Sequence, residues 1–113
     1  MKELRIKYDF SHGPIWKDKY DVEKGIWSTG IDIIDNDKVL MDLNEKAENE
    51  YSMLYHFDKD GVLNFDTQAF ISKQDALLSL IQSIVLRVES LNDGSFVVVD
   101  EESKRLSGNK EQL

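Results

Sequence analysis

The stretch SKQDALLSLIQSIVLRVESL, residues 72–91, decides the fold. Its apolar residues recur every three or four positions, which places them on one broad face of a helix. The stripe consists of Leu77, Leu80, Ile81, Ile84, Val85, Val88 and Leu91. Ser72 and Asp75 have the spacing of a capping box, and Gly94 follows the last apolar residue as a stop signal. The pattern predicts the main core helix over residues 72–91.

A second helix is predicted over residues 36–53. Asp35-Asn36-Asp37 is a strong start signal, because short side chains with oxygen atoms cap free amides at a helix N-terminus. Apolar residues then recur at helical spacing. They are Leu40, Leu43, Ala47, Tyr51 and Leu54, and the opposite face carries Lys38, Asp42, Glu45, Asn49 and Ser52.

Strands are predicted in the first third of the chain. Residues 3–10, ELRIKYDF, alternate between apolar and charged side chains, as a half-buried strand does. Residues 26–34, IWSTGIDII, are rich in β-branched side chains, and Gly30 indicates a bulge. Ser11-His12-Gly13-Pro14 breaks the first strand, and residues 15–25 fit neither pattern, so we expect an irregular or extended arm there with a turn at Lys24-Gly25.

Three further strands are predicted. Residues 53–57 and 62–65 flank Asp58-Lys59-Asp60-Gly61, a sequence typical of a hairpin turn. Residues 95–99, SFVVV, are almost wholly apolar, which is typical of a central strand covered on both faces. The order of elements predicts one α+β domain over residues 1–100. We expect an approximately five-stranded, mainly antiparallel sheet covered by the two helices, and a polar, disordered tail over residues 101–113.

Composition narrows the class of protein. A chain of 113 residues suits one domain, and its 41% hydrophobic content is enough for a core. There is no cysteine, which excludes disulfide frameworks and thiolate zinc sites. The start MKELRIKYDF has no apolar run of signal-peptide length, and no run of roughly 18 apolar residues occurs. We therefore expect a soluble, cytoplasmic protein with no membrane partner.

Charge is concentrated in the middle third of the chain. Residues 31–66 hold ten acids against three lysines, a net charge of −7, while the whole chain carries −8. The acids are Asp32, Asp35, Asp37, Asp42, Glu45, Glu48, Glu50, Asp58, Asp60 and Asp66. Such a charge repels nucleic acid and favours a basic protein partner.

Two acidic groups raise the question of a metal ion. Asp58 and Asp60 resemble the start of a calcium loop, but the twelfth position holds Ala69 instead of glutamate, so a hairpin turn is the preferred interpretation. Asp32, Asp35 and Asp37 could hold magnesium beside a strand end. No glycine-rich phosphate loop accompanies them, so a helix cap with solvated acids is preferred.

Other catalytic patterns are missing from the sequence. His12 and His56 lack an HExxH motif, and Ser28 lacks the GxSxG context of a nucleophile. We predict no enzymatic activity and no cofactor. The aromatic residues are a more useful guide, because tryptophan and tyrosine dominate binding hot spots. Trp27, Tyr51 and Tyr55 are expected mainly in the core, and Trp16 beside the Gly-Pro break is expected to be an exposed anchor.

The segments GPIW (13–16) and TGIDIIDND (29–37), with the acidic helix that follows, give the chain a family resemblance. It resembles the immunity proteins of bacterial toxin–immunity systems, including the partners of contact-dependent growth inhibition toxins and of nuclease bacteriocins. The resemblance implies a one-to-one complex with a cognate toxin, often a nuclease, and inhibition of that toxin.

Physical reasoning about such an inhibitor selects a docking face. A carboxylate surface steers a basic partner into a fast encounter, and aromatic anchors supply affinity. The predicted partner-binding residues are Asp32, Asp35, Asp37, Asp42 and Glu45, with Trp16 and Tyr55 as anchors. Two other hypotheses stay open: a small metal-dependent enzyme that uses Asp32, Asp35 and Asp37, and a regulatory interaction domain with a different partner.

Overall fold

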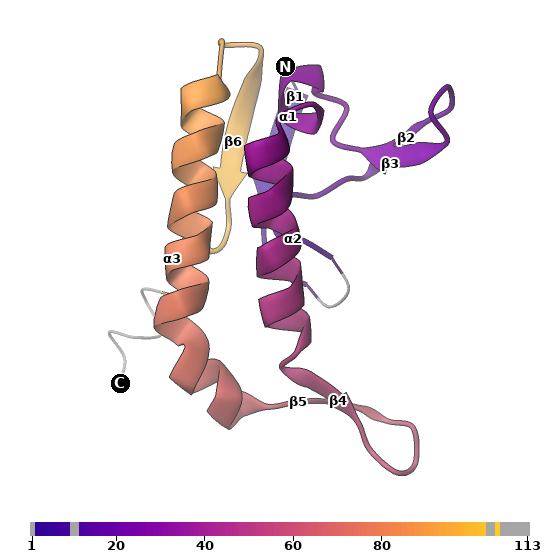
Figure 1. The fold of residues 1–113 in the computed structure, drawn as a ribbon, viewed down its shortest axis with the longest axis vertical. Coiled ribbons are helices and arrows are strands. Elements are labelled where there is room, and N and C mark those ends of the chain that lie inside the picture. The colour runs from indigo at the N-terminus through magenta and orange to yellow at the C-terminus, as the bar shows by residue number, and fades with distance from the viewer. Residues whose placement is uncertain (1, 10–11, 104–105, 107–113) are drawn as a thin grey trace.

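The computed structural model describes residues 2–9, 12–103 and 106, and it has the α+β class that the sequence predicts (Figure 1). In chain order its elements are β1 (Lys2–Ile6), β2 (Lys19–Asp21), β3 (Ile26–Ser28), α1 (Asp32–Asp35), α2 (Lys38–Ser52), β4 (Tyr55–Phe57), β5 (Leu63–Phe65), α3 (Thr67–Leu91) and β6 (Phe96–Asp100). The helices α2 and α3 lie side by side, and two β-hairpins project away from them.

The predicted five-stranded antiparallel sheet is wrong. In the described part of the chain the strands form three separate two-stranded sheets, β1–β6, β2–β3 and β4–β5. The first is parallel, with Lys2 beside Phe96 and Ile6 beside Asp100. The other two are local hairpins with strands of three residues each, which are too short to extend a common sheet across the helices.

The predicted strand over residues 26–34 ends at Ser28, and the following segment forms α1. Gly30 has φ +77°, a left-handed conformation that interrupts the extended backbone. The carboxylate of Asp35 accepts hydrogen bonds from both the amide and the hydroxyl of Thr29, each at 3.0 Å. This local bonding closes the chain into a helical turn and overrides the strand preference of the β-branched residues.

The helix predicted over residues 36–53 is confirmed as α2. Asp37 is its N-cap residue, and its side chain accepts a hydrogen bond of 2.9 Å from the amide of Leu40. The predicted apolar face is the buried one, with Leu40, Ala47 and Tyr51 in the interior. Sequence capping rules therefore locate this helix correctly.

The core helix is present as α3, but it begins at Thr67, five residues before the predicted start. Asp66 is the N-cap residue and accepts a hydrogen bond of 3.0 Å from the amide of Ala69. Ser72 lies inside the helix, where its hydroxyl donates to the carbonyl of Ala69. The predicted capping box is therefore wrong, because an equally suitable cap occurs earlier in the chain. The end at Leu91 is as predicted.

By length and composition alone, α3 is long and apolar enough to cross a membrane. This is weak support for a membrane span, because the core helix of a soluble protein passes the same test. Four residues of its stripe are fully buried within the protein. They are Leu77, Ile81, Ile84 and Val88. The structure is thus compatible with a soluble protein.

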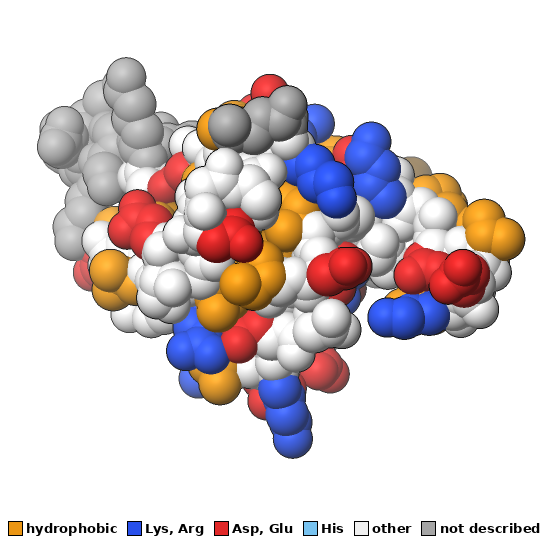
Figure 2. All heavy atoms as spheres, turned by 90° about the horizontal axis from the view of Figure 1, so that it is seen from above, with side chains coloured by type: hydrophobic (Ala, Val, Ile, Leu, Met, Phe, Trp, Pro, Cys, Tyr) orange, Lys and Arg blue, Asp and Glu red, His pale blue; other side chains and the backbone are white. Residues whose placement is uncertain are grey.

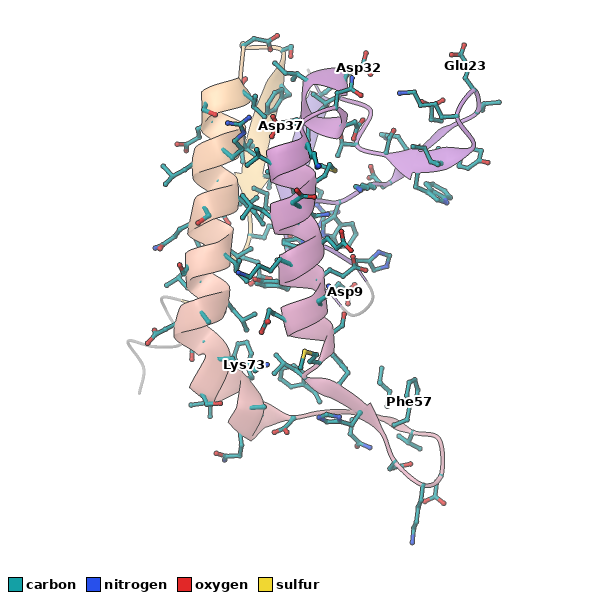
Figure 3. All side chains as sticks on the ribbon, viewed as in Figure 1. Asp9, Glu23, Asp32, Asp37, Phe57 and Lys73 are labelled. Carbon is teal, nitrogen blue, oxygen red and sulfur yellow. The ribbon has the colours of Figure 1, made fainter. Side chains whose placement is uncertain are left out.

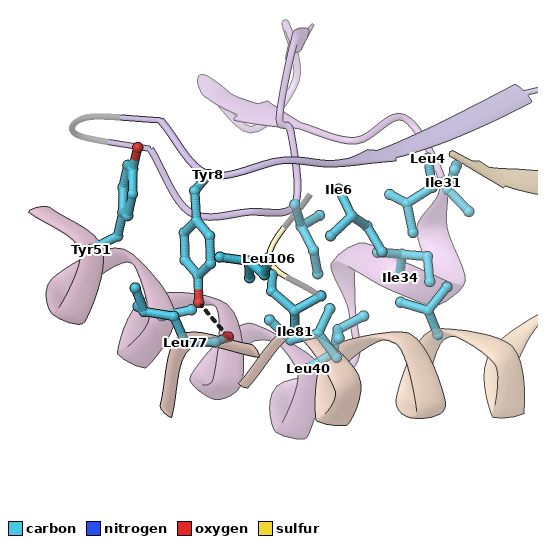
Figure 4. Close-up of a cluster of buried hydrophobic side chains, with 14 of the residues drawn as sticks. Leu4, Ile6, Tyr8, Ile31, Ile34, Leu40, Tyr51, Leu77, Ile81 and Leu106 are labelled. Atoms are coloured by element: carbon cyan, nitrogen blue, oxygen red, sulfur yellow. Dashed lines mark hydrogen bonds between the residues drawn. The ribbon is translucent and has the colours of Figure 1, made fainter. Parts of the chain in front are cut away.

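The core joins both ends of the chain to the helices (Figure 4). Leu4 and Ile6 of β1 pack with Ile34 of α1, and side chains of α2 and α3 complete the cluster. Tyr8 inserts beside them, and its hydroxyl donates a hydrogen bond of 3.1 Å to the carbonyl of Leu77. The core is therefore assembled from segments that are remote in the sequence.

The C-terminal part of the described chain differs from the prediction in two ways. The strand β6 is not covered on both faces, because Val97 is 42% exposed. The polar tail expected from residue 101 is wrong for Glu102 and Leu106, which are both fully buried. The carboxylate of Glu102 accepts a hydrogen bond of 2.9 Å from the amide of Tyr8. Residues 104–105 and 107–113 of that tail lie outside the described residues.

The two projecting hairpins differ in how well the sequence predicted them. The β4–β5 hairpin is confirmed, and Asp58 stabilises its turn by accepting hydrogen bonds of 2.9 Å from the amides of Asp60 and Val62. In the β2–β3 hairpin, β3 lies within the strand predicted over residues 26–34, whereas β2 lies where an irregular arm was expected. Its predicted turn at Gly25 is confirmed, with φ +67° at that residue.

Candidate functional site

A cavity of about 470 Å³ is formed by the segment of residues 12–18, the β2–β3 hairpin and α2. Its lining combines apolar and aromatic side chains with charged and polar ones. The residues are His12, Gly13, Ile15, Trp16, Lys17, Asp18, Trp27, Asn44 and Glu48. A cavity of this size, mostly apolar and with a few convergent polar groups, has the character of a binding site.

The floor of the cavity is fixed to α2 through Asn44. This side chain is buried, and its oxygen accepts a hydrogen bond of 2.8 Å from the amide of Ile15. Gly13 lies against the side-chain carboxamide of Asn44, and a methyl group at Gly13 would overlap that carboxamide. The close packing explains why a glycine occupies this position, and it holds the segment that carries Trp16 against the helix.

Trp16 is half-buried and held in a defined orientation. Its indole N–H donates a hydrogen bond of 2.9 Å to the carbonyl of Lys7. The guanidinium carbon of Arg5 lies 4.6 Å from the centre of the indole ring, in the range of a cation–π interaction. His12 lies 6.2 Å from the same indole, with nearly parallel rings. Trp16 is therefore a rigid wall of the cavity more than a freely exposed anchor.

A second cavity of about 460 Å³ lies on the β1 side of Trp16. Its lining includes the basic residues Lys2, Arg5 and Lys19. Trp16 and Asp18 border both cavities, so they form the partition between them.

The position of Trp27 in the structure differs from the predicted one. It is 60% exposed, so the prediction that it fills the core is wrong. It lies directly opposite Tyr20 in the β2–β3 pair, with ring centres 5.3 Å apart, and Tyr20 is also more than half exposed. The placement of Tyr20 and Trp27 on either side of the Gly25 turn is a sequence signal that could have identified this cross-strand pair.

Hydrophobic side chains therefore lie exposed among charged ones on the projecting β2–β3 hairpin. Figure 2 shows the molecule from above, with orange, red and blue side chains mixed on this part. Tyr20, Val22, Ile26 and Trp27 all expose more than half of their surface. Exposed aromatic and aliphatic groups that cluster on one projection are typical of a protein-binding surface.

Three of the predicted acidic residues lie free on the surface. Asp42 and Glu45 are exposed on the outer face of α2, three positions apart and therefore neighbours on the helix surface. Glu48, three positions further, lines the cavity. Asp32 is exposed on α1 and points away from the body of the protein (Figure 3). The carboxylates of α2 thus extend from the outer face of the helix to the edge of the cavity.

Asp35 and Asp37 have structural roles. Asp35 is engaged by Thr29, as described above. Asp37 lies at the start of α2, where its two oxygens accept hydrogen bonds of 2.9 and 2.6 Å from the guanidinium of Arg87 on α3. This guanidinium, together with the amide of Leu40, lowers the pKa of the Asp37 carboxyl. Both carboxylates are thus engaged by groups of the protein itself.

Substitutions at Asp37 separate its two roles. Asp37→Ala removes both the cap and the ion pair with Arg87, and the loss of the cap alone should lower the free energy of unfolding by about 1–2 kcal/mol. Asp37→Asn keeps a capping oxygen and loses only the ion pair with Arg87. Because the folded-state pKa is lowered, the ion pair stabilises the protein above the unfolded pKa of about 3.9 and is lost as the pH falls through the folded value.

The expected result is that Asp37→Asn is less stable than the natural chain at neutral pH. The difference should shrink steadily as the pH falls below about 4. Urea unfolding at a series of pH values measures it. A difference that stays constant into the acid range would show that the ion pair contributes nothing to the stability.

Tyr55 has contacts that give it a structural role too. It is half-buried, and its ring lies 5.7 Å from Tyr51 and 5.0 Å from Phe65 in edge and tilted arrangements. Its hydroxyl is 3.4 Å from that of Tyr51. This cluster anchors the β4–β5 hairpin to α2, away from the cavity.

The arrangement gives no geometric support to a metal site. Within the described residues, no three histidine, aspartate or glutamate side chains come together in a group that could hold a metal ion. Asp35 and Asp37, two of the three predicted ligands, are engaged by different partners.

The chain matches no protein-family model, no curated protein and no solved structure.

Proposed function

We propose that this protein neutralises a cognate toxin in the bacterial cytoplasm. The toxin is a basic protein, and the two form a one-to-one complex. The observation that carries the proposal is the combination of exposed Trp27 and Tyr20 on a projecting hairpin with the exposed carboxylates of α2. The cavity lies between these two elements. A basic nuclease domain is the class of toxin that best fits a chain with a net charge of −8.

The two parts of this surface have different physical roles. Aromatic side chains provide most of the affinity in protein complexes, because they bury a large area and lose little conformational entropy. Carboxylates accelerate the encounter with a positively charged partner and reject acidic ones. Asp42 and Glu45 are suited to the second role, since both are exposed on the outer face of α2.

An inhibitor of this kind also needs a rigid surface, because ordering a flexible one on binding lowers the affinity. The segment that carries Trp16 has this rigidity. Asn44 ties Ile15 to α2, and the Trp16 indole is bonded to Lys7. The base of the β2–β3 hairpin is tied down by a hydrogen bond of 2.7 Å from Lys2 to the carbonyl of Gly30. The docking face proposed from the structure thus consists of Tyr20 and Trp27 on the hairpin with Asp42 and Glu45 on α2, and these contacts support its being preformed.

Neutralisation of growth inhibition tests the proposal. The reading frame encoded beside this protein is expressed from an inducible promoter, with and without this chain. We expect the neighbouring polypeptide to stop growth alone and to lose that effect when this chain is present, because immunity genes accompany their toxins. The purified pair should elute as a one-to-one complex.

Two results would contradict the proposal. One is a neighbouring polypeptide that does not affect growth, and the other is a toxic polypeptide that remains toxic and does not form a complex with this chain. The Ile84→Ala variant, which is expected to be less stable, is the control. It should restore growth less well than the natural chain if the rescue requires the folded protein.

A further inference from the structure

We propose that the cavity between Trp16 and Trp27 is a binding site for a guanidinium group, and that its occupant is an arginine side chain of the basic partner. The choice of a partner's side chain as the source rests on the proposed function. The choice of a guanidinium rests on the chemistry of the cavity wall, which combines indole rings with carboxylates.

The indole rings favour a planar cation. Tryptophan is the best aromatic partner of a cation, and a guanidinium stacks on its face more readily than the compact ammonium of lysine does. The protein itself supplies an example, since the guanidinium of Arg5 lies 4.6 Å from the centre of the Trp16 ring. Trp27 also lines the cavity, and as a mostly exposed side chain it has surface available to a second guanidinium.

Two carboxylates on the cavity wall supply the opposite charge. Asp18 and Glu48 both line it, and neither forms an ion pair with any residue of the described chain. A guanidinium presents its N–H donors in a planar fork that suits carboxylates. Lys17 also lines the cavity, but its exposed ammonium can remain in water on a flexible stem. The cavity wall thus carries two carboxylates against one ammonium group, a balance that favours a cation.

The neighbouring helix surface strengthens this selection. Glu45 lies one turn from Glu48 on α2 and is exposed. A basic segment steered by Asp42 and Glu45 would therefore arrive next to the cavity, where one arginine could insert between the indoles. The site in this way connects the electrostatic and aromatic parts of the docking face.

A titration with small compounds tests the site without any protein partner. The chain contains two tryptophans, so its indole N–H groups give two NMR signals, which a Trp27→Phe variant assigns. The probe is N-acetyl-arginine amide, and the matched control is N-acetyl-citrulline amide, which has nearly the same shape without the charge. We expect saturable shifts of the tryptophan signals with the arginine compound and none that saturate with the citrulline compound.

Variants locate the binding. Glu48→Gln should weaken the binding of the arginine compound by about tenfold, because a charge-assisted hydrogen bond is lost. Asp60→Asn removes the same charge from the distant β4–β5 turn and should leave the binding unchanged. Equal weakening by both variants, equal response to both compounds, or no shift at all would overturn the site. Neutralisation of a toxin despite such a result would leave the proposed function intact, so the two failures are distinguishable.

Discussion

Replacement of Ile84 by alanine is expected to lower the free energy of unfolding by about 2–5 kcal/mol. Ile84 lies in the second half of α3 and has no exposed surface. The substitution removes buried apolar area and leaves a cavity that the surrounding side chains fill only in part. Urea unfolding of the two proteins, followed by circular dichroism, measures the difference.

Leu86→Ala is the matched control. Leucine has the same volume as isoleucine, and this one lies two positions further along the same helix with 68% of its surface exposed. Its replacement should change the free energy of unfolding by no more than about 0.5 kcal/mol. Equal losses for the two variants would show that α3 does not bury the face that the structure assigns to the core.

Charge reversal on α2 is expected to have the largest effect on binding. The double substitution Asp42→Lys and Glu45→Lys replaces two exposed carboxylates of the docking face by ammonium groups. Association with the basic toxin should slow by about tenfold or more at low salt, because the steering field is reversed there. Stopped-flow fluorescence gives the association rate constant, with Trp27 as the natural reporter.

The control variant changes the net charge by the same amount elsewhere. Asp60→Lys and Glu89→Lys also alter exposed acids. Asp60 lies in the β4–β5 turn. Glu89 is two residues beyond Arg87, which faces α2, so it lies on the far flank of α3. Association should slow much less for this pair than for the pair on α2. Equal slowing would mean that only net charge matters and that no particular face is used.

The helices were predictable because their signals are local. The periodicity of Leu40 and Ala47 and the cap at Asp37 lie within the helix they define. The start of α3 was not predictable from local signals alone, because Asp66 and Ser72 are both suitable caps. The structure selects the earlier one and extends α3 over residues 67–71, which include the partly buried Phe70.

The sheets were not predictable in the same way. The alternation of residues 3–10 indicates a strand, but it says nothing about the partner, and β1 pairs with a strand that begins at Phe96. The burial of Glu102 depends on the amide of Tyr8, 94 positions away. Such contacts join residues that are far apart in the sequence and depend on how the whole chain packs. A short stretch of sequence therefore does not reveal them.

The candidate site was predicted in part. The acids of α2 were identified by their charge, and Asp42 and Glu45 do lie on the surface. The sequence could not show that Asp37 is engaged by Arg87, 50 positions away, and is therefore structural. Trp27 was missed because its exposure depends on the pairing of β2 with β3, which the irregular pattern of residues 11–25 concealed.

The salt dependence of association tests the central claim most directly. The rate constants of the natural chain, the α2 reversal and the control reversal are measured against the toxin at low and at high ionic strength. Steering by an acidic face predicts that the natural chain loses its advantage over the α2 reversal as salt screens the charges. Equal association rates at low salt for the natural chain and the α2 reversal would contradict it.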